Sequence, residues 1–368
     1  MSGDSAGGKD VHSIAEPAIR PFTNWHRRIY ALLGLTVLLI GAIILGIGVG
    51  STSIPLPTVG EVLLSKLPFY DLPADISSGT DTIVSDIRMP RVLLAAITGA
   101  ALAIAGAAYQ GLFRNPLADP FLMGVASGAG LGAVIGMAFT AGWVSWLAFG
   151  LIPPFAFAGA LSAVLVVYGV SRVGNTLPVT IMILAGVIVA AFYGAVSHYL
   201  MLTVEEITHQ GLSFLWGGGL ATASWDEVKI VIPLVILAMG VICLYGRHLN
   251  VMQLDEEQAQ QLGVDVEKVK RILIVAATMI TASAVAFAGV IGFVGIIVPH
   301  FVRLVWGPDY RFLMPLSMIL GALFLVLADT TLRVIPGPED IPIGIFTAFI
   351  GGPFFLYLLR KKKGEVLF

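Results

Sequence analysis

Long apolar runs that carry almost no charge constrain this 368-residue chain more than any other feature. A window of about 20 residues, the length that a helix needs to cross the hydrocarbon core of a bilayer, finds these runs. The candidate spans cover residues 29–50, 92–113, 121–141, 147–170, 179–202, 228–246, 272–288, 290–305, 312–332 and 342–359. Because lipid offers no hydrogen-bond partners, each span must satisfy its own backbone. The sequence therefore predicts an all-α, polytopic membrane helical bundle of about ten transmembrane helices, although short or glycine-broken runs leave a count of eight to ten open.

The composition excludes several classes of protein. Charged residues make up 12% of the chain, about half the share found in a soluble domain. The net charge of −2 offers no basic surface for nucleic acid. The single cysteine, Cys243, excludes an intrachain disulfide and argues against a thiolate metal site. No Ser/His/Asp set, HExxH motif or carboxylate dyad is present, so we expect no enzyme activity, no metal ligands and no cofactor in this chain.

The distribution of lysine and arginine predicts the orientation and the domain organisation. With the N-terminus in the cytoplasm, ten spans leave 16 of the 21 basic residues on the inner side. This bias places both termini in the cytoplasm and the chain in the cytoplasmic (inner) membrane. We expect a polar cytoplasmic leader (1–28), a single transmembrane domain (29–360) and a short cytoplasmic tail (361–368).

Three ionisable residues lie within or beside the predicted spans, namely His198, His300 and Asp329. An intramembrane ionisable group is a functional candidate by default. None of the three forms a spaced pair on one helix face, so structural hydrogen bonding near helix ends is favoured over a ligand or proton-relay role. The sequence assigns no mechanistic role to His198 or His300.

The segment "LDEEQAQQLGVDVEKVK" (254–270) differs from the rest of the chain, since it holds five acidic residues and two lysines. Its apolar positions and Gly263 predict two short amphipathic helices joined at that glycine. A surface helix lying among lipid headgroups is normally lysine-rich, whereas this one begins with Asp255, Glu256 and Glu257. The segment therefore favours a cytoplasmic protein partner, with a merely solvated connector as the alternative.

Several segments together resemble the permease subunits of type II ABC importers, the family that takes up ferric siderophores, haem and vitamin B12. The resemblance is carried in matching order by "IRMPRVLLAAITGAALAIAGAAYQGLFRNPLADPFLMGVASGAGLGA", "LNVMQLDEEQAQQLGV", "VAFAGVIGFVGIIVPHFVR" and "EDIPIGIFTAFIGGPFFLYLL". It runs from about residue 30 to 360 and does not cover the leader, to which no function is assigned.

This resemblance implies a set of partners. The chain would assemble with a second copy of itself, two ATP-binding cassette subunits and an extracytoplasmic substrate-binding protein. Its transmembrane helices would contact membrane lipid. ATP and Mg²⁺ would be held by the partner subunits, because this chain has no complete P-loop: Asp10 stands where Ser or Thr would bind magnesium. The complex would import a bulky metal chelate (ferric siderophore, haem or cobalamin), and the sequence does not say which.

The resemblance also implies roles for particular residues. ATPase coupling would fall to Leu254, Glu256, Glu257, Gln260 and Gly263. Docking of the binding protein would fall to Arg88, Arg91 and Arg333, although anchoring of a span among headgroups is the alternative for the first two. A cytoplasmic gate would include Asn115 and Leu117, in "RNPLADP".

Other classes of function stay open on the residues alone. An ion-coupled secondary transporter would also have many spans, but it usually needs buried carboxylates or broken helices that bind ions. A membrane-embedded enzyme would have to use His198, His209 and His300. ATP-driven import through a permease subunit is the function that we expect.

Overall fold

The computed structural model describes residues 25–50, 52–69, 71–73, 76–140, 145–204, 207–335 and 341–363, with side chains described outside 145–149, 357–359 and 361–363. The first 24 residues of the expected leader and the last five of the expected tail lie outside the described residues.

Each of the ten expected spans is a helix. They are α1 (Trp25–Gly48), α4 (Met89–Leu112), α5 (Val125–Thr140), α6 (Ser145–Ser171), α7 (Val179–Thr203), α9 (Trp225–Leu244), α12 (Val266–Ala288), α13 (Val294–Trp306), α14 (Tyr310–Leu332) and α15 (Ile343–Lys363). Seven helices in the described part are long and apolar enough to cross a membrane, and α5, α13 and α15 are shorter apolar helices. The predicted all-α membrane bundle is confirmed.

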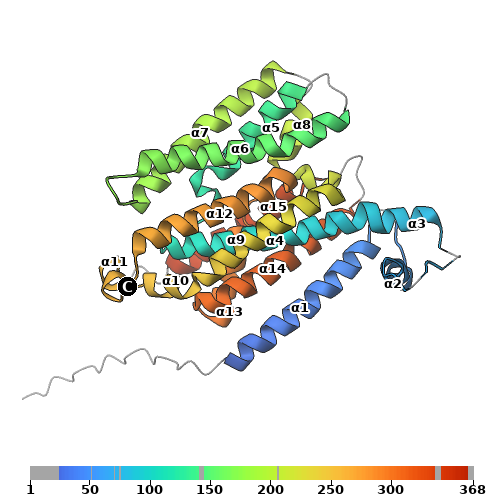
Figure 1. Cartoon of the computed structure of the whole chain (residues 1–368), viewed down its shortest axis with the longest axis horizontal. Helices are drawn as coiled ribbons and strands as arrows, with labels where there is room; N and C mark the ends of the chain where they lie inside the picture. The colour runs from blue at the N-terminus through green and yellow to red at the C-terminus, as the bar shows by residue number, and fades with distance from the viewer. Residues whose placement is uncertain are drawn as a thin grey trace, which may run out of the picture.

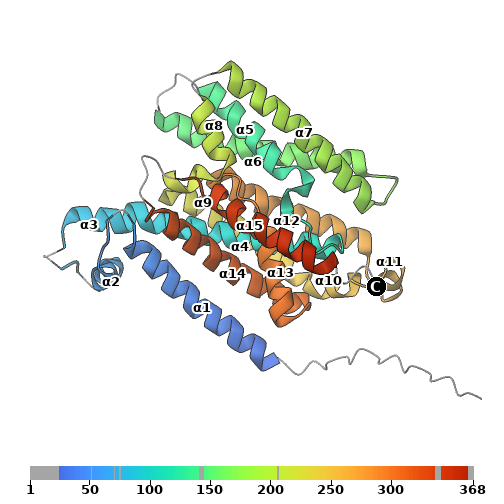
Figure 2. The same ribbon diagram turned by 180° about the vertical axis from the view of Figure 1, so that it is seen from behind.

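Helix α4 is the central element of the bundle. It packs against α9, α12, α13 and α14, while α5, α6 and α7 form a layer on one side and α1 lies along the other (Figures 1 and 2). Glycine allows this close packing, because a Cβ on Gly99 would lie 2.2 Å from the carbonyl oxygen of Gly321, and one on Gly106 would lie 1.8 Å from that of Gly295. Small residues at such crossings let helix backbones approach within contact distance in a membrane.

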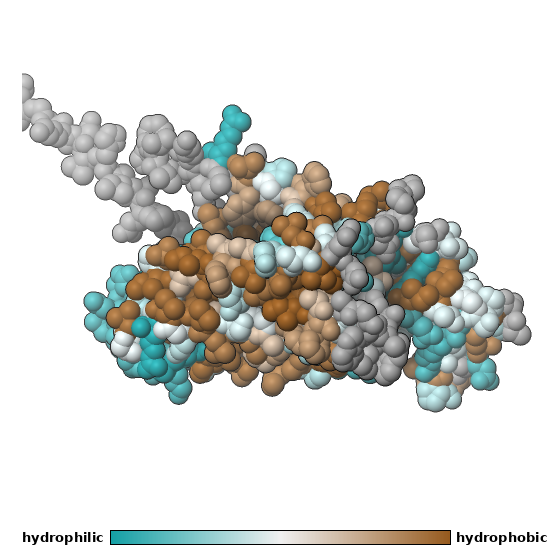
Figure 3. Space-filling view, turned by 90° about the horizontal axis from the view of Figure 1, so that it is seen from above, coloured by the Kyte–Doolittle hydropathy of each residue, from teal (hydrophilic) through white to brown (hydrophobic). Residues whose placement is uncertain are grey.

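Polar groups gather at the two ends of the bundle. Figure 3 shows an apolar belt across the middle of one face, with hydrophilic residues at either end. Arg28 lies at one end beside Trp306 and Asp309, whereas Arg333 lies at the other end beside the last turn of α1. Arg28, predicted to lie inside, and Arg333, predicted to lie outside, thus fall at opposite ends of the molecule.

Shorter helices lie at both ends. At the Arg333 end are α2 (Leu56–Ser65), α3 (Ser78–Thr82) followed by the π-helical turn η1 (Ile83–Arg88), α8 (Thr208–Leu215) and the 3₁₀ turn η4 (Gly218–Thr222). At the opposite end lie the 3₁₀ turn η2 (Pro120–Met123), α10 (Gly246–Met252) and α11 (Glu256–Gln261).

One detail of the sequence prediction is wrong. The segment after Gly263 is not a second short helix, because α12 begins at Val266 and continues without a break to Ala288. A hydropathy window misses this continuity because the first turns of α12 are polar. The predicted break at Gly263 itself is present: its φ is +84°, and the Val264 N–H donates to the carbonyl of Ala259, as at a glycine-capped helix end.

Candidate functional site

The predicted coupling segment is an exposed ledge at the α10–α11 end of the bundle. Ala259 is its buried anchor, while Leu254 is 45% exposed and Leu262 is 64% exposed. We call the exposed side chains of this ledge the α11 surface; they are Leu254, Asp255, Glu257, Gln258, Gln260, Gln261 and Leu262. Apolar side chains exposed beside charged ones suit contact with another protein.

Glu256 differs from the other predicted coupling residues because it faces the bundle. Its Oε1 lies 2.9 Å from Nζ of Lys270, which is only 3% exposed and also lies 3.0 Å from Glu267. Glu257, in contrast, is exposed on α11. Glu256 therefore compensates a buried ammonium, whereas Asp255 and Glu257 are the acidic residues that the α11 surface presents.

The predicted gate residues form a tight turn after α4. The Leu117 N–H donates to Oδ1 of Asn115 over 3.0 Å, and the Ala118 N–H donates to the Asn115 carbonyl over 3.1 Å. An asparagine side chain that accepts from the backbone two residues later fixes such turns. Arg114, just before the turn, has a φ of +49°, which is uncommon for a residue other than glycine.

Arg114 joins this turn to the coupling segment. Its Nη1 donates to the carbonyl of Leu254 over 3.1 Å and to Oδ1 of Asp255 over 3.3 Å. Nearby, Nε2 of Gln253 donates to the carbonyl of Gly111 over 3.0 Å. The structure thus brings the predicted gate and the predicted coupling residues together. Sequence reasoning did not single out Arg114, although it directly precedes Asn115 in "RNPLADP".

A second contact holds α10 to the start of α14. Asp309, the N-cap of α14, accepts from Nδ2 of Asn250 over 2.7 Å and from Nη2 of Arg311 over 2.6 Å. Burial alone would raise the pKa of Asp309, but the hydrogen bonds from Arg311 and Asn250 outweigh it and lower the pKa to about 2. Arg114, just after α4, therefore holds the ledge directly, and Asp309 at α14 holds α10, the helix that precedes the ledge.

The three predicted docking arginines lie together at the opposite end, yet their side chains are engaged within the chain. Asp329, which is 2% exposed, lies 2.9 Å from Nε of Arg91 and 2.9 Å from Nε of Arg333. Arg88 is buried and donates to the carbonyls of Ile47 and Gly48, and Arg333 donates to those of Gly46 and Val49. These carbonyls belong to the last turn of α1 and the residue after it, so Arg88 and Arg333 cap that helix.

The histidines that the structure describes do not form a ligand set. His300 is buried in α13, and Nδ1 of the exposed His198 lies 2.6 Å from the carbonyl of Gly194, one turn earlier in α7. In the part of the chain that the structure describes, no group of three or more His, Cys, Asp or Glu residues could hold a metal ion.

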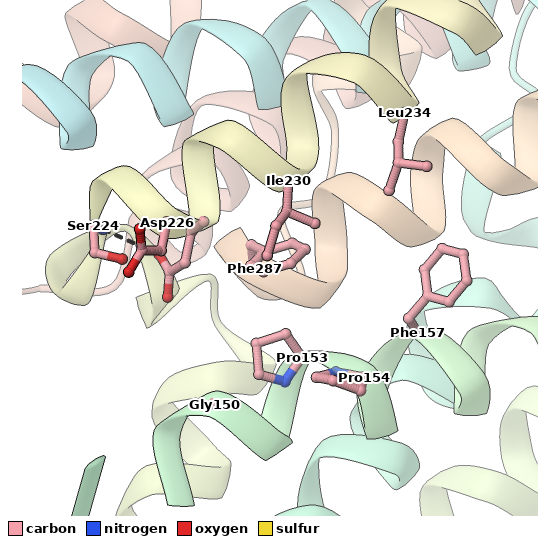
Figure 4. Close-up of a pocket in the computed structure, with 10 residues that line it drawn as sticks. Gly150, Pro153, Pro154, Phe157, Ser224, Asp226, Ile230, Leu234 and Phe287 are labelled. Atoms are coloured by element: carbon pink, nitrogen blue, oxygen red, sulfur yellow. Dashed lines mark hydrogen bonds between the residues drawn. The ribbon is translucent and has the colours of Figure 1, made fainter. Parts of the chain in front are cut away.

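A crevice of about 460 Å³ lies between α6 and the α9–α12 pair (Figure 4). Pro153 and Phe157 of α6 face Ile230, Leu234 and Phe287 across it. Its polar end is formed by the first turn of α9, where Glu227 accepts from the Ser224 N–H over 3.2 Å in a capping box. The polar groups here begin a helix and do not form a catalytic constellation.

Comparison with known proteins places these features in a wider context. The model of the FecCD transport family matches residues 38–361. The chain is 42% identical over 317 residues to the cobalamin import system permease protein BtuC of Halobacterium salinarum, covering 86% of this chain and 82% of that protein. It is 36% identical over 291 residues to the hemin transport system permease protein HmuU of Yersinia pestis, covering 77% of this chain and 84% of that protein. Among solved structures, it resembles one described as an inward-facing metal-chelate type ABC transporter, with a TM-score of 0.77, 29% identity, and coverage of 90% of this chain and 99% of that one.

Proposed function

The chain belongs to the FecCD transport family and is a membrane-spanning permease subunit of an ABC importer, and we propose from that premise that it imports a bulky metal chelate. The chelate class is supported by relatives named for cobalamin, hemin and iron(3+)-hydroxamate import. Ferric siderophore, haem and cobalamin are the three candidates within that class.

The proposed complex contains two copies of this chain, two ATP-binding cassette subunits and an extracytoplasmic binding protein. The α11 surface supports the assignment of the ATPase side, because it presents Leu254, Leu262 and Glu257 beyond the apolar belt. ATP and Mg²⁺ are held by the partner subunits. In this arrangement the chain spans the inner membrane, and both of its termini lie in the cytoplasm. The end of the bundle that carries Arg333 faces outward.

One observation carries the proposed mechanism, namely the hydrogen bonds from Arg114 to Leu254 and Asp255. ATP binding closes the partner subunits and displaces the ledge that rests on them. Because Arg114 and Gln253 tie the ledge to the end of α4, that displacement reaches the turn at Asn115 and Leu117. The two ends of the path then open alternately, as required of a pump with two conformational states.

Docking of the binding protein by Arg88, Arg91 and Arg333 stays a proposal with an added requirement. Arginine suits this role because its planar group binds a carboxylate through two hydrogen bonds. A partner carboxylate would have to compete with Asp329 for Arg91 and Arg333. The pairs of Arg91 and Arg333 with Asp329 therefore support a docking site that forms only when a carboxylate of the binding protein replaces Asp329 at one of these arginines.

Reconstitution of the whole complex tests the function. The permease, its co-encoded ATPase and its binding protein are placed in proteoliposomes, and uptake of a ferric siderophore, haem and cobalamin is measured with ATP, without ATP and with a protonophore. We expect uptake of one chelate that needs both ATP and the binding protein. Uptake that continues without ATPase but stops with the protonophore would instead support an ion-coupled transporter.

A further inference from the structure

A groove between α9 and α12 is lined by apolar side chains along most of its length. Its volume is about 390 Å³, and its walls include Leu237 and Val241 of α9 and Val275 and Met279 of α12. Leu237 is 70% exposed and Val275 is 62% exposed, so the groove faces the surroundings of the bundle. At one end its apolar lining stops at Arg271. We propose that this groove binds an acyl chain of an anionic phospholipid whose phosphate contacts Arg271.

The length of the groove matches one leaflet of a bilayer. Met279 lies two turns beyond Arg271, which corresponds to about 12 Å along a helix axis. Half of a hydrocarbon core is about 15 Å thick. The groove therefore spans nearly the whole apolar depth of the leaflet on the Arg271 side, as a single acyl chain does.

The charge of Arg271 is available to a phosphate. Its side chain is exposed, and its hydrogen bond within the described residues runs from Nε to the carbonyl of Glu267 over 3.3 Å. The carboxylate of Glu267 is occupied by Lys270 at 3.0 Å and by the Leu177 N–H at 3.2 Å. Because a neutral carbonyl leaves the positive charge uncompensated, the guanidinium can bind phosphate oxygens through its remaining N–H groups.

Neighbouring charges favour an anionic over a zwitterionic lipid. Lys268 lies one turn before Arg271, and Arg247 follows the end of α9; both are exposed at the same end of the bundle. The phosphate of a zwitterionic lipid carries its own cation, which these residues would repel. Basic residues beside a transmembrane helix at the cytoplasmic surface attract anionic headgroups by about 1 kcal/mol each.

The lipid site does not depend on which chelate is transported. It does include α12, a helix that moves in the proposed mechanism. Helix α12 follows α11 after the break at Gly263 and carries Arg271 in its second turn. A lipid held between α9 and α12 thus contacts the helix that connects the α11 surface to the bundle. Lipid retention can be measured without any transport assay, so its failure is distinguishable from failure of the proposed function.

Native mass spectrometry of the purified complex tests the proposal. The complex is equilibrated with equal amounts of phosphatidylglycerol and phosphatidylcholine that carry identical acyl chains. We expect the wild type to retain phosphatidylglycerol preferentially. R271Q should lower the ratio of bound phosphatidylglycerol to phosphatidylcholine about fivefold, the equivalent of one arginine at an anionic surface, whereas R271K should keep most of it.

Two further variants separate a specific site from general surface charge. R172Q removes an exposed arginine from the loop after α6, outside the groove, and should leave the ratio unchanged. V275W fills the groove and should reduce retention of both lipids, with an unchanged unfolding temperature as the check on folding. An equal ratio in wild type and R271Q would overturn the proposal. Efficient disulfide cross-linking of V275C between two copies in the membrane, with the exposed Cys243 replaced by alanine, would overturn it as well, because a second copy would then cover the groove.

Discussion

Arg114 at the end of α4 donates a hydrogen bond to the carbonyl of Leu254, a residue 140 positions later in the chain. The contact joins the turn that holds Asn115 to the ledge that presents Glu257, two regions for which we expect different roles, gating and ATPase coupling. The ledge therefore cannot move far without moving the end of α4 or breaking this bond.

Replacement of Arg114 by alanine should uncouple transport from ATP hydrolysis. Arg114 is partly exposed, so the loss of its contacts should cost little stability. We expect the complex to assemble and hydrolyse ATP, while the amount of chelate imported per ATP falls several-fold. R172A, which removes an exposed arginine bonded only to the nearby Gly174 carbonyl within the described residues, is the matched control. An unchanged ratio of uptake to hydrolysis in R114A would exclude this link from the mechanism.

Charge reversal at Glu256 and Glu257 should have different effects. E257K places a lysine on the α11 surface and should weaken retention of the ATPase, because a repulsive charge in an interface costs several kcal/mol. E256K leaves Lys270 without this partner and should instead lower the unfolding temperature of the isolated permease. Co-purification and thermal unfolding in detergent measure the two effects. Full ATPase retention by E257K would remove Glu257 from the interface.

The Asp329 pairs should stabilise the end of the bundle that carries Arg333. D329N removes the charge that compensates two largely buried arginines, and breaking a buried pair in this way costs about 3–5 kcal/mol. D226N, at an exposed pair with Lys229, should change stability by less than about 1 kcal/mol. Denaturant unfolding of both variants is the measurement, and equal midpoints would show that the pairs contribute no net stability.

Docking of the binding protein by the arginines should depend on salt. Ion pairs at a surface weaken as the Debye length falls from about 10 Å at 0.1 M to about 3 Å at 1 M salt. We expect R91Q to reduce binding-protein affinity at low salt and to flatten its salt dependence. Affinity is measured on the detergent-purified complex, with K229Q as the control for an exposed lysine at the same end. Equal salt dependence in wild type and R91Q would place docking elsewhere.

The contact between α10 and α14 should weaken in acid. The folded pKa of Asp309, about 2, lies below its usual value of 3.8. The ionised form is therefore favoured by folding, and its stabilisation is present above pH 4 and lost as the pH falls towards 2. D309N should lower the unfolding temperature at pH 7. The difference in unfolding temperature between D309N and wild type should be smaller at pH 3. A constant difference between the two proteins across this range would contradict the assignment.

The sequence by itself determined the helices and their approximate ends. Apolar runs near residues 92–113 and 312–332 must be helical because lipid cannot bond to an open backbone, and they became α4 and α14. Gly263 marked a helix end correctly, since few other residues adopt a positive φ without strain. The acidic segment before it was predicted to be exposed, and most of α11 is exposed.

Tertiary structure alone decided which of these residues meet. Hydropathy does not distinguish a helix that faces lipid from one that faces protein, so the apolar sequences of α4 and α7 do not reveal that α4 is central and α7 peripheral. Glu256 and Glu257 are adjacent in sequence, but the packing of α11 against α12 directs only Glu256 to Lys270. Arg91 was predicted to face outward, yet Asp329 lies beside it from 238 positions away. Such pairings depend on how the helices cross, and the close approaches at Gly99 and Gly106 set those crossings.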